Sequence, residues 1–429
     1  MEVGSENSLW QATGIELDTS PTLQDEIQTD VVIVGAGFTG LSAALQLSEN
    51  NTNVVVLDKY DVGFGASGRN GGQVNPMLPY NSPEDIQKII GNHFFENLCQ
   101  ASLNSADALF ELIEKYKIDC DARQKGWLRV DHCEKARKTS LHNAEGWIKY
   151  GAKMEPVDQT EVERLSGTSF YKSGIIAEKG GAVQPLSLAR GEAKAAIKLG
   201  AKIFSNSPVT ALNKQGDKWV VDTPKGKVTA NWVILATNGY TDGLYSGLSK
   251  SLLPIVSVQM ATEPLDDDQI GEILPEGQTI SDTRRSIMYS RREPDNRMVF
   301  GGHGKVTKNG FAGFEHMIKD VSQIFPSLKN VDWKFRWGGK LAVTDDHLPH
   351  YHEPEAGLIV GLGYNGRGVA MSHVMGKCLA DRVLDMPVKQ LPFPSTKINS
   401  IPFWGIQMMG VGPVVSVMKI LDKLESRTD

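Results

Sequence analysis

The sequence predicts an α/β protein with two joined domains, one built on parallel strands and the other on a mainly antiparallel sheet. Three observations support this prediction. The 429 residues exceed what one hydrophobic core usually holds. The run 31–34 is continuously apolar and β-branched, as in a strand buried on both faces of a parallel sheet. The region 253–337 is instead rich in short, charged strands, which is typical of an antiparallel sheet.

The first apolar strand is followed by a glycine turn. Gly35, Gly37 and Gly40 occupy the G-x-G-x-x-G frame, and the stretch 41–48 continues as a helix with small and apolar residues on one side. The first glycine permits the tight turn, the second lets the backbone approach a pyrophosphate, and the third lets helix and strand pack closely. The pyrophosphate would lie on the positive end of the helix. This pattern predicts a Rossmann-like unit that binds a dinucleotide.

The next apolar strand, 54–57, ends in an acid. Asp58 stands near the offset of about 20 residues at which such an acid bonds a ribose hydroxyl. Because this acid also repels a 2′-phosphate, NADP is disfavoured as the ligand. A nicotinamide enzyme would normally continue with another helix and strand. Here the stretch 63–72 is a long glycine-rich loop, whose backbone amides could approach a second planar part of the ligand.

A strand, a glycine turn and a helix recur late in the chain. The apolar strand 357–361 leads to the turn 363–368 and then to a predicted helix over 369–384. No acidic strand follows this second pattern. The geometry suits an anionic acceptor at the helix N-terminus, because the partial positive charge there stabilises negative charge.

The fingerprint at Gly35, the loop 65–72 and the late segment 361–368 together resemble the FAD-dependent amine and amino-acid oxidases of the D-amino-acid oxidase superfamily. Within it the chain is most similar to the gamma-glutamylputrescine oxidases. The resemblance runs from about residue 30 into the tail. It implies a two-domain fold like that of D-amino-acid oxidase and glutathione reductase, with a Rossmann-like FAD-binding domain and FAD held in an extended pose.

The resemblance also implies which residues contact the FAD. Val209 would present its backbone to the adenine, Ala236 and Gly239 would let the chain pass close to the cofactor, and the turn 363–368 would meet the pyrimidine O2 of the flavin. Relatives with covalent FAD attach it through cysteine or histidine, and His347 is the candidate here, but we expect non-covalent FAD. The expected cofactor-binding residues are Gly35, Gly37, Phe38, Thr39, Gly40, Asp58, Lys59, Gly65, Ala66, Ser67, Arg69, Asn70, Gly71, Gly72, Gln73, Val209, Ala236, Gly239, Gly363, Tyr364, Asn365, Gly366, Arg367 and Gly368.

The implied reaction is oxidation of a C–N bond in an amine or N-substituted amino acid resembling gamma-glutamylputrescine. A hydride passes from the carbon next to nitrogen to flavin N5, water hydrolyses the imine, and O2 reoxidises the flavin to give H2O2. One alternative is a dehydrogenase of the same fold, of sarcosine or pipecolate type, that passes electrons to a quinone. A third hypothesis, from another class, is a flavin-binding protein without turnover.

Candidate catalytic residues are Lys340, Arg367, Tyr289 and His303. Lys340 could place a cation near flavin N1 or the oxygen site, with a surface lysine as the alternative. Arg367 stands inside the glycine turn, where the gamma-glutamylputrescine oxidases tend to carry histidine, and could bind a substrate carboxylate bidentately. Tyr289 and His303, together with Arg291 and Tyr364, are candidate pocket walls, each with a structural role as the alternative. Arg69 could stabilise an anionic flavin or brace its loop.

The segment 345–352 holds three histidines and two aspartates, which could suggest a metal. Pro349 interrupts the spacing of His347, His350 and His352, and no other ligand group lies nearby in sequence. We therefore expect no metal site.

Periodicity and start signals predict the remaining elements. Ser82 followed by Pro83 is a helix start signal. Helices are expected at 82–117, 134–150, 186–199 and 314–325, and strands at 121–130, 202–204, 208–212, 218–223, 227–235, 255–262, 286–291, 297–301 and 333–337.

These elements give the predicted domains. They are an arm over 1–29 that packs through Trp10 and Ile15, a discontinuous FAD-binding domain over 30–80, 150–245 and 338–392, peripheral helices over 81–149, a substrate domain over 246–337 and an apolar tail over 393–429. The tail carries two prolines and three glycines within 401–415 and is short for a membrane span. We favour packing on the protein or on a partner subunit, with peripheral membrane contact as the alternative.

Composition limits the partners and the compartment. The net charge of −6 gives no basic surface for nucleic acid. The four cysteines form no C-x-x-C pair and no zinc spacing, which favours a reducing compartment. Residues 1–28 are polar and acidic and do not have the pattern of a signal peptide. We therefore expect a cytoplasmic protein whose partners are a small-molecule amine or amino acid and either O2 or a quinone.

Overall fold

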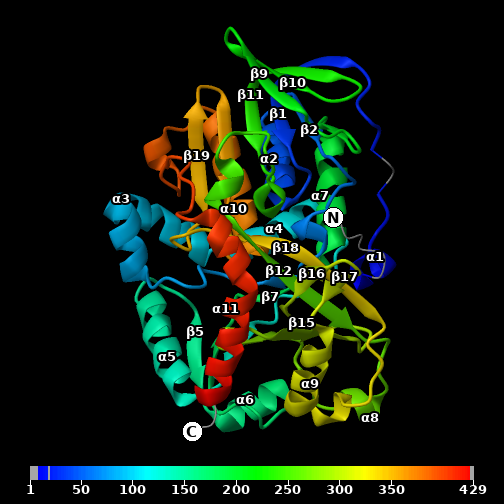
Figure 1. The fold of residues 1–429 in the computed structure, drawn as a ribbon, viewed down its shortest axis with the longest axis vertical. Coiled ribbons are helices and arrows are strands. Elements are labelled where there is room, and N and C mark those ends of the chain that lie inside the picture. The colour runs from blue at the N-terminus through cyan, green and yellow to red at the C-terminus, as the bar shows by residue number, and fades with distance from the viewer. Residues whose placement is uncertain (1–7, 18–19, 426–429) are drawn as a thin grey trace.

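A computed structural model describes residues 8–17 and 20–425. In this part the chain forms two large sheets, which occupy the upper and lower halves of the view in Figure 1. The upper sheet is built on parallel strands and the lower sheet is mainly antiparallel, so the predicted fold class is confirmed.

The first sheet has the strand order β19-β20-β11-β1-β2-β8, with β10 and β9 attached to β11 as a meander. The five strands from β20 to β8 run parallel, and β19 is an antiparallel edge strand. The strand bounds are β1 Glu26–Val34, β2 Val54–Leu57, β8 Lys202–Phe204, β9 Ala211–Gln215, β10 Lys218–Asp222, β11 Lys227–Leu235, β19 His350–Glu355 and β20 Leu358–Leu362.

Both faces of this sheet are covered, which explains the continuous apolar run in β1. Val31 and Ile33 pack into a core formed with helices, whereas Val32 and Val34 pack into a second core beside the β9–β10 meander. The helices on the first face are α2 Phe38–Glu49, α4 Ser105–Tyr116, α7 Pro185–Lys198 and α10 Gly368–Val383.

The second sheet has the order β18-β12-β15-β14-β13-β4-β6-β5. Every neighbouring pair is antiparallel except β13 and β4. Helix α9 covers one face, where its apolar side chains join the core of this domain. The bounds are β4 Trp127–Val130, β5 Met154–Val157, β6 Gly174–Ala177, β12 Leu253–Ala261, β13 Thr279–Asp282, β14 Tyr289–Arg292, β15 Met298–His303, β18 Phe335–Val343 and α9 Phe314–Ile324.

The predicted domain boundaries are wrong in one region. Strand β4 comes from the segment 81–149, expected at the periphery of the nucleotide domain, yet it pairs with β13 and β6 inside the second sheet. Strands β5 and β6 come from the segment 150–245, expected in the FAD-binding domain, and join the same sheet. A short strand carries no local signal of which sheet it joins, because that choice depends on partners far along the chain.

Smaller elements complete the fold. The predicted helix 82–117 is two helices, and α3 is kinked at Gly91, where φ is +77°. Ser82 caps α3 and Pro83 begins it, as the start signal predicts. The remaining bounds are α1 Leu9–Thr13, α3 Pro83–Leu103, α5 Glu134–Ile148, α6 Gln159–Ser166, α8 Asp267–Ile270, β3 Gln73–Val74, β7 Gly181–Ala182, β16 Lys305–Thr307 and β17 Gly310–Ala312.

The tail forms one helix, α11 Trp404–Glu425, the red helix in Figure 1. The sequence did not predict this helix, because its glycines and Pro413 disfavour helical structure. The indole of its first residue donates to the carbonyl of Leu252 at 2.8 Å, and Asp422 and Glu425 form ion pairs with Arg285. Both ends of the helix therefore contact the protein, which agrees with the first of the two arrangements expected for the tail. Across the described residues, no helix combines the length and apolarity needed to span a bilayer.

Helices α2 and α10 pack against each other through small residues. A Cβ added at Gly376 of α10 would lie 2.6 Å from Cβ of Ser42 and 2.7 Å from the carbonyl oxygen of Thr39. Ser42 Oγ also donates to the carbonyl of His373 at 3.2 Å. The close contact brings the first turns of the two helices together.

We expect Gly376→Ala to destabilise the protein. Overpacking of this kind costs about 1–3 kcal/mol, so the melting temperature should fall, because neither backbone can move without displacing a glycine turn. Gly405 is the matched control, since it lies exposed in the first turn of α11 with no atom within 4 Å of an added Cβ. Gly405→Ala should keep or raise the melting temperature. Equal melting temperatures for the two variants would contradict the close packing.

Candidate active site

The first glycine turn joins β1 to α2. Gly35 has φ of +112°, and a Cβ there would lie 2.8 Å from the carbonyl oxygen of Ala236. A Cβ at Gly40 would overlap the Gly35 carbonyl oxygen, so α2 begins in direct contact with the turn. The amide of Phe38 donates to Ser67 Oγ at 2.9 Å. The positive end of α2 therefore meets the glycine-rich loop.

Asp58 ends β2 beside this turn. Its carboxylate accepts from the amide of Ala36 at 2.7 Å and from the amide of Tyr60 at 2.8 Å. Burial raises the pKa of Asp58 to about 6, against the opposing effect of the two amide donors. Lys59 is exposed, with its ammonium 5.2 Å from the centroid of the Tyr60 ring. The acid thus lies at the glycine turn, where the sequence places the ribose-binding group.

The loop 65–72 is held in place by two tryptophans. Trp10 of α1 is fully buried and its Nε1 donates to the carbonyl of Asn70 at 2.8 Å. Trp337 of β18 donates to the carbonyl of Arg69 at 3.0 Å. The Arg69 side chain is buried and donates to two backbone carbonyls, which supports the interpretation that it braces the loop. The arm packs as expected through Trp10, while Ile15 is half-buried.

The late glycine turn meets the first one. The hydroxyl of Tyr364 and Oγ1 of Thr39 form a buried hydrogen bond of 2.6 Å. Gly363 and Gly366 have φ of +82° and +87°, and Asn365 closes the turn by donating to the Gly363 carbonyl at 2.6 Å. Two segments that are far apart in the chain therefore lie side by side.

The end of β11 passes beside both turns. The Ala236 amide donates to the last residue of β1 at 2.9 Å, and Asn238 Oδ1 accepts from the Gly363 amide at 2.9 Å. Gly239 lies against β18, where a Cβ would come within 3.1 Å of a backbone oxygen. Val209 precedes β9, half-buried beside the second core of the first sheet. The roles expected for Ala236 and Gly239 beside the cofactor stay predictions.

One row of residues crosses the second sheet on the face that meets the loop 65–72. Directly paired residues of neighbouring strands point to the same face. The Tyr289 ring lies 2.6 Å from the position of a Cβ on Gly71, and its hydroxyl contacts Ser257 at 2.8 Å and Gln259 at 3.0 Å. The row consists of Arg129, Ser281, Tyr289, Gly301, Gln259 and Trp337.

The other candidates from the sequence lie around this row. His303 is half-buried at the end of β15 and opposite Ser257, so it shares the face of Tyr289. Lys340 is exposed, with its ammonium 5.8 Å from the centroid of the Tyr240 ring. Arg291 is buried, ion-paired with a glutamate and bonded to two backbone carbonyls, so its role is structural. Gln73 likewise donates to two carbonyls of the second sheet.

Two arginines lie at the end of the row. The guanidinium carbon of Arg367 is 4.4 Å from the centroid of the Trp127 ring. Arg129 follows Trp127 by two positions on β4, so their side chains point to one face. Burial and the nearby charge of Arg129 lower the pKa of Arg367. The sequence analysis missed Arg129, because a single charge in a strand also fits a solvated face.

The histidines of 345–352 face separate partners. His350 Nε2 lies 3.0 Å from the carboxylate of Asp346, and the ring of His347 packs on Tyr80 with centroids 4.7 Å apart. His352 Nδ1 is 2.8 Å from a backbone carbonyl, and burial lowers the pKa of His352 to about 4. The three histidines therefore contact different groups, and within the described residues Nδ1 of His347 and Nε2 of His352 are buried without a hydrogen-bond partner.

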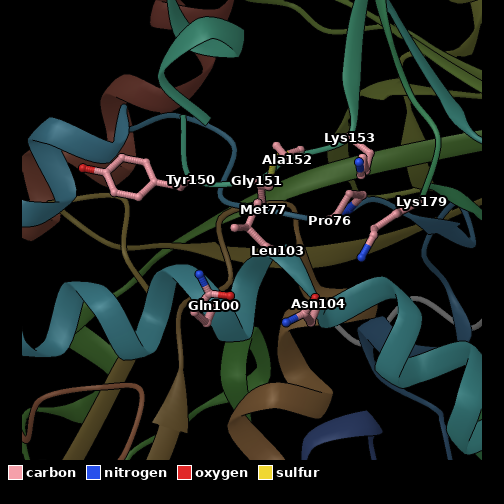
Figure 2. Close-up of a pocket in the computed structure, with 10 residues that line it drawn as sticks. All are labelled: Pro76, Met77, Gln100, Leu103, Asn104, Tyr150, Gly151, Ala152, Lys153 and Lys179. Atoms are coloured by element: carbon pink, nitrogen blue, oxygen red, sulfur yellow. The ribbon is translucent and has the colours of Figure 1, made fainter. Parts of the chain in front are cut away.

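A cavity of about 150 Å³ lies apart from the glycine turns, between the α3–α4 junction and the stretch 150–153. Figure 2 shows Gln100 and Asn104 on the helices and Lys153 and Lys179 across from them. Lys179 is ion-paired with Asp107. The lining offers amides and ammonium groups but no acid–base pair, so we do not place the chemistry there.

Comparison with known families identifies the chain. The family model described as "DAO: FAD dependent oxidoreductase" matches residues 30–382. The chain belongs to this family. FAD is therefore its cofactor, and the protein is an oxidoreductase. The site fits FAD on its own features too, since the backbone of the first turn leaves no room for a side chain and Asp58 lies beside it.

Relatives cover most of the chain. A gamma-glutamylputrescine oxidoreductase of Escherichia coli is 32% identical over 411 residues, which are 92% of this chain and 95% of the relative. A probable oxidoreductase OrdL of Haemophilus influenzae is 33% identical over 393 residues, 89% of each chain. The crystal structure of glycine oxidase from Geobacillus kaustophilus superimposes with a TM-score of 0.73 at 22% identity, covering 86% of this chain and 99% of that one. The resemblance inferred from the glycine segments is thus confirmed.

We expect Asp58 to make the stability of the FAD-free protein depend on pH. The pKa of Asp58 is raised by burial from 3.8 to about 6, so folding favours the protonated carboxyl. The protonated carboxyl of Asp58 contributes fully to the free energy of unfolding below pH 3.8, and this contribution is lost as the pH rises through 6. The melting temperature of the wild type minus that of Asp58→Asn should therefore fall as pH increases across this window. Asp217→Asn, at an exposed position, is the control. A difference that rises with pH would contradict the burial of this group.

Proposed function

We propose that this DAO-family protein oxidises a C–N bond of an amine resembling gamma-glutamylputrescine, with non-covalent FAD and with O2 as the electron acceptor. The observation that carries the proposal is the buried hydrogen bond between Thr39 and Tyr364, which joins the two glycine turns predicted to hold opposite parts of one cofactor. The 32% identity to the Escherichia coli gamma-glutamylputrescine oxidoreductase supports the substrate class.

The residues of the chain have distinct proposed roles. FAD, when bound, accepts the hydride from the carbon next to nitrogen. The N-terminus of α10 offers partial positive charge to the cofactor, and Lys340 adds a cation at its rim. Tyr289, fixed by Ser257 and Gln259, forms one wall beside the glycine loop, and His303 extends that wall. A rigid wall holds the substrate so that its amine and its C–H bond keep one orientation.

The test is flavin reduction without oxygen. The purified holoprotein should be yellow, and gamma-glutamylputrescine should bleach it under anaerobic conditions, faster than glycine, sarcosine or proline does. The matched control is the same amine acetylated on the reacting nitrogen, because the lone pair of an amide nitrogen is delocalised into the carbonyl and no longer assists hydride loss. A holoprotein that no amine of such a panel reduces would overturn the proposal.

A second candidate function is a dehydrogenase that passes electrons to a quinone. The specific observation is the exposure of apolar side chains on and beside α11, with Phe403 79% and Ile406 63% exposed. Such side chains could contact a membrane surface where a quinone is dissolved.

Peroxide yield separates the two functions. In air, an oxidase should release about one H2O2 for each amine oxidised, because O2 is then the only acceptor present. A dehydrogenase should release little peroxide in air and should turn over only when a soluble quinone is added. The measurement is peroxide and aldehyde from the same reaction, with the quinone added alone as the control.

A further inference from the structure

Two positive charges share one wall where the second sheet meets the start of α10. Arg367 precedes α10 and lies over Trp127, and Arg129 projects from the same face of β4. Both arginines are half-buried. Each is therefore partly removed from water at a position where it also repels the other.

No carboxylate of the described residues forms an ion pair with either guanidinium. Nε of Arg367 is buried without a hydrogen-bond partner there. The acid closest in sequence to Arg129 is Asp131. Its carboxylate accepts hydrogen bonds from the hydroxyls of Ser140 at 2.7 Å and Ser173 at 3.0 Å. Two positive charges and this one negative charge leave a net charge of about +1. Because a partly buried charge is destabilising without a partner, this cluster suits an anionic ligand.

The position of the pair sets how far that anion lies from the glycine loop. Arg129 and Tyr289 belong to the same row, with the strand of Ser281 between them. Neighbouring strands are about 4.8 Å apart, so roughly 10 Å separate Arg129 from Tyr289 along the sheet. Tyr289 packs on Gly71 of the glycine-rich loop. An anion on the arginines therefore lies at the other end of this wall.

We propose that Arg129 and Arg367 together bind a carboxylate of the substrate, at the end remote from the C–N bond that is oxidised. This inference rests on the proposed function. Guanidinium groups present planar forks that match a carboxylate, and one carboxylate neutralises the net charge of the cluster. The pair makes the enzyme specific for linear amines with a distant carboxylate, over diamines and simple alkylamines.

Binding can be tested without turnover, using adipate as the probe on the holoprotein. Adipate should raise the melting temperature of the wild type, and hexanol should not. Arg129→Gln should lose the adipate shift, and Arg129→Lys should recover part of it. Arg129→Gln should not lower the melting temperature without adipate, because it removes a charge that has no partner. Arg137→Gln, on the exposed side of α5, is the matched control and should keep the full shift. If Arg129→Gln does not fold, Arg367→Gln is measured instead, and it should likewise lose the adipate shift.

Kinetics supply the second readout. We expect 6-aminohexanoate to reduce the flavin of the wild type with a KM about 10- to 100-fold below those of hexylamine and 1,6-diaminohexane. Arg129→Gln should remove this advantage through KM and leave kcat within a few fold. Equal adipate shifts in wild type and variant, or equal KM values for the three amines, would overturn the arginine pair while leaving the amine oxidase intact. Failure of every amine to reduce the flavin would instead overturn the proposed function.

Discussion

The hydrogen bond between Thr39 and Tyr364 depends on how closely α2 and α10 approach each other. The proposed cofactor site depends on this hydrogen bond and on the contact between the two helices. Gly376 sets that approach, since any side chain there would strike Ser42. The two turns lie far apart in the chain and meet through this hydrogen bond. The close contact of the helices therefore brings together the two strand–turn–helix units that we propose to hold FAD.

The second sheet contributes a wall, and the register of its strands decides which side chains share one face. Tyr289 meets the glycine loop because it stands opposite Gly301, whose missing side chain leaves room for the ring. The same register places Arg129 two strands away. A shift of one residue in β4 would turn Arg129 to the apolar core and Leu128 to the face that meets the loop 65–72, so the strand pairing decides which side chains this face presents.

The first glycine turn and the acid beside it could be predicted from sequence, because the signals are local. Gly35, Gly37 and Gly40 act within one turn, and Asp58 follows at a fixed offset. The assembly of the second sheet could not be predicted in the same way. Strand β4 is four residues long and its partners lie far along the chain, so its pattern says nothing of the sheet it joins. Arg129 was not predicted, because a single charge in a strand also fits a solvated face, whereas the packing of the arm through Trp10 was expected.

The pairing of β4 with β13 also has a consequence for the protein as a unit. The chain enters the second sheet at β4, β5 and β6, leaves it for α7, β8 and the meander, and returns at β12. Neither half is a continuous stretch that could be excised or transplanted. Many native contacts join residues distant in sequence, so folding should be slow and the halves should melt together. Cleavage of the chain between β6 and α7 would therefore destabilise both sheets.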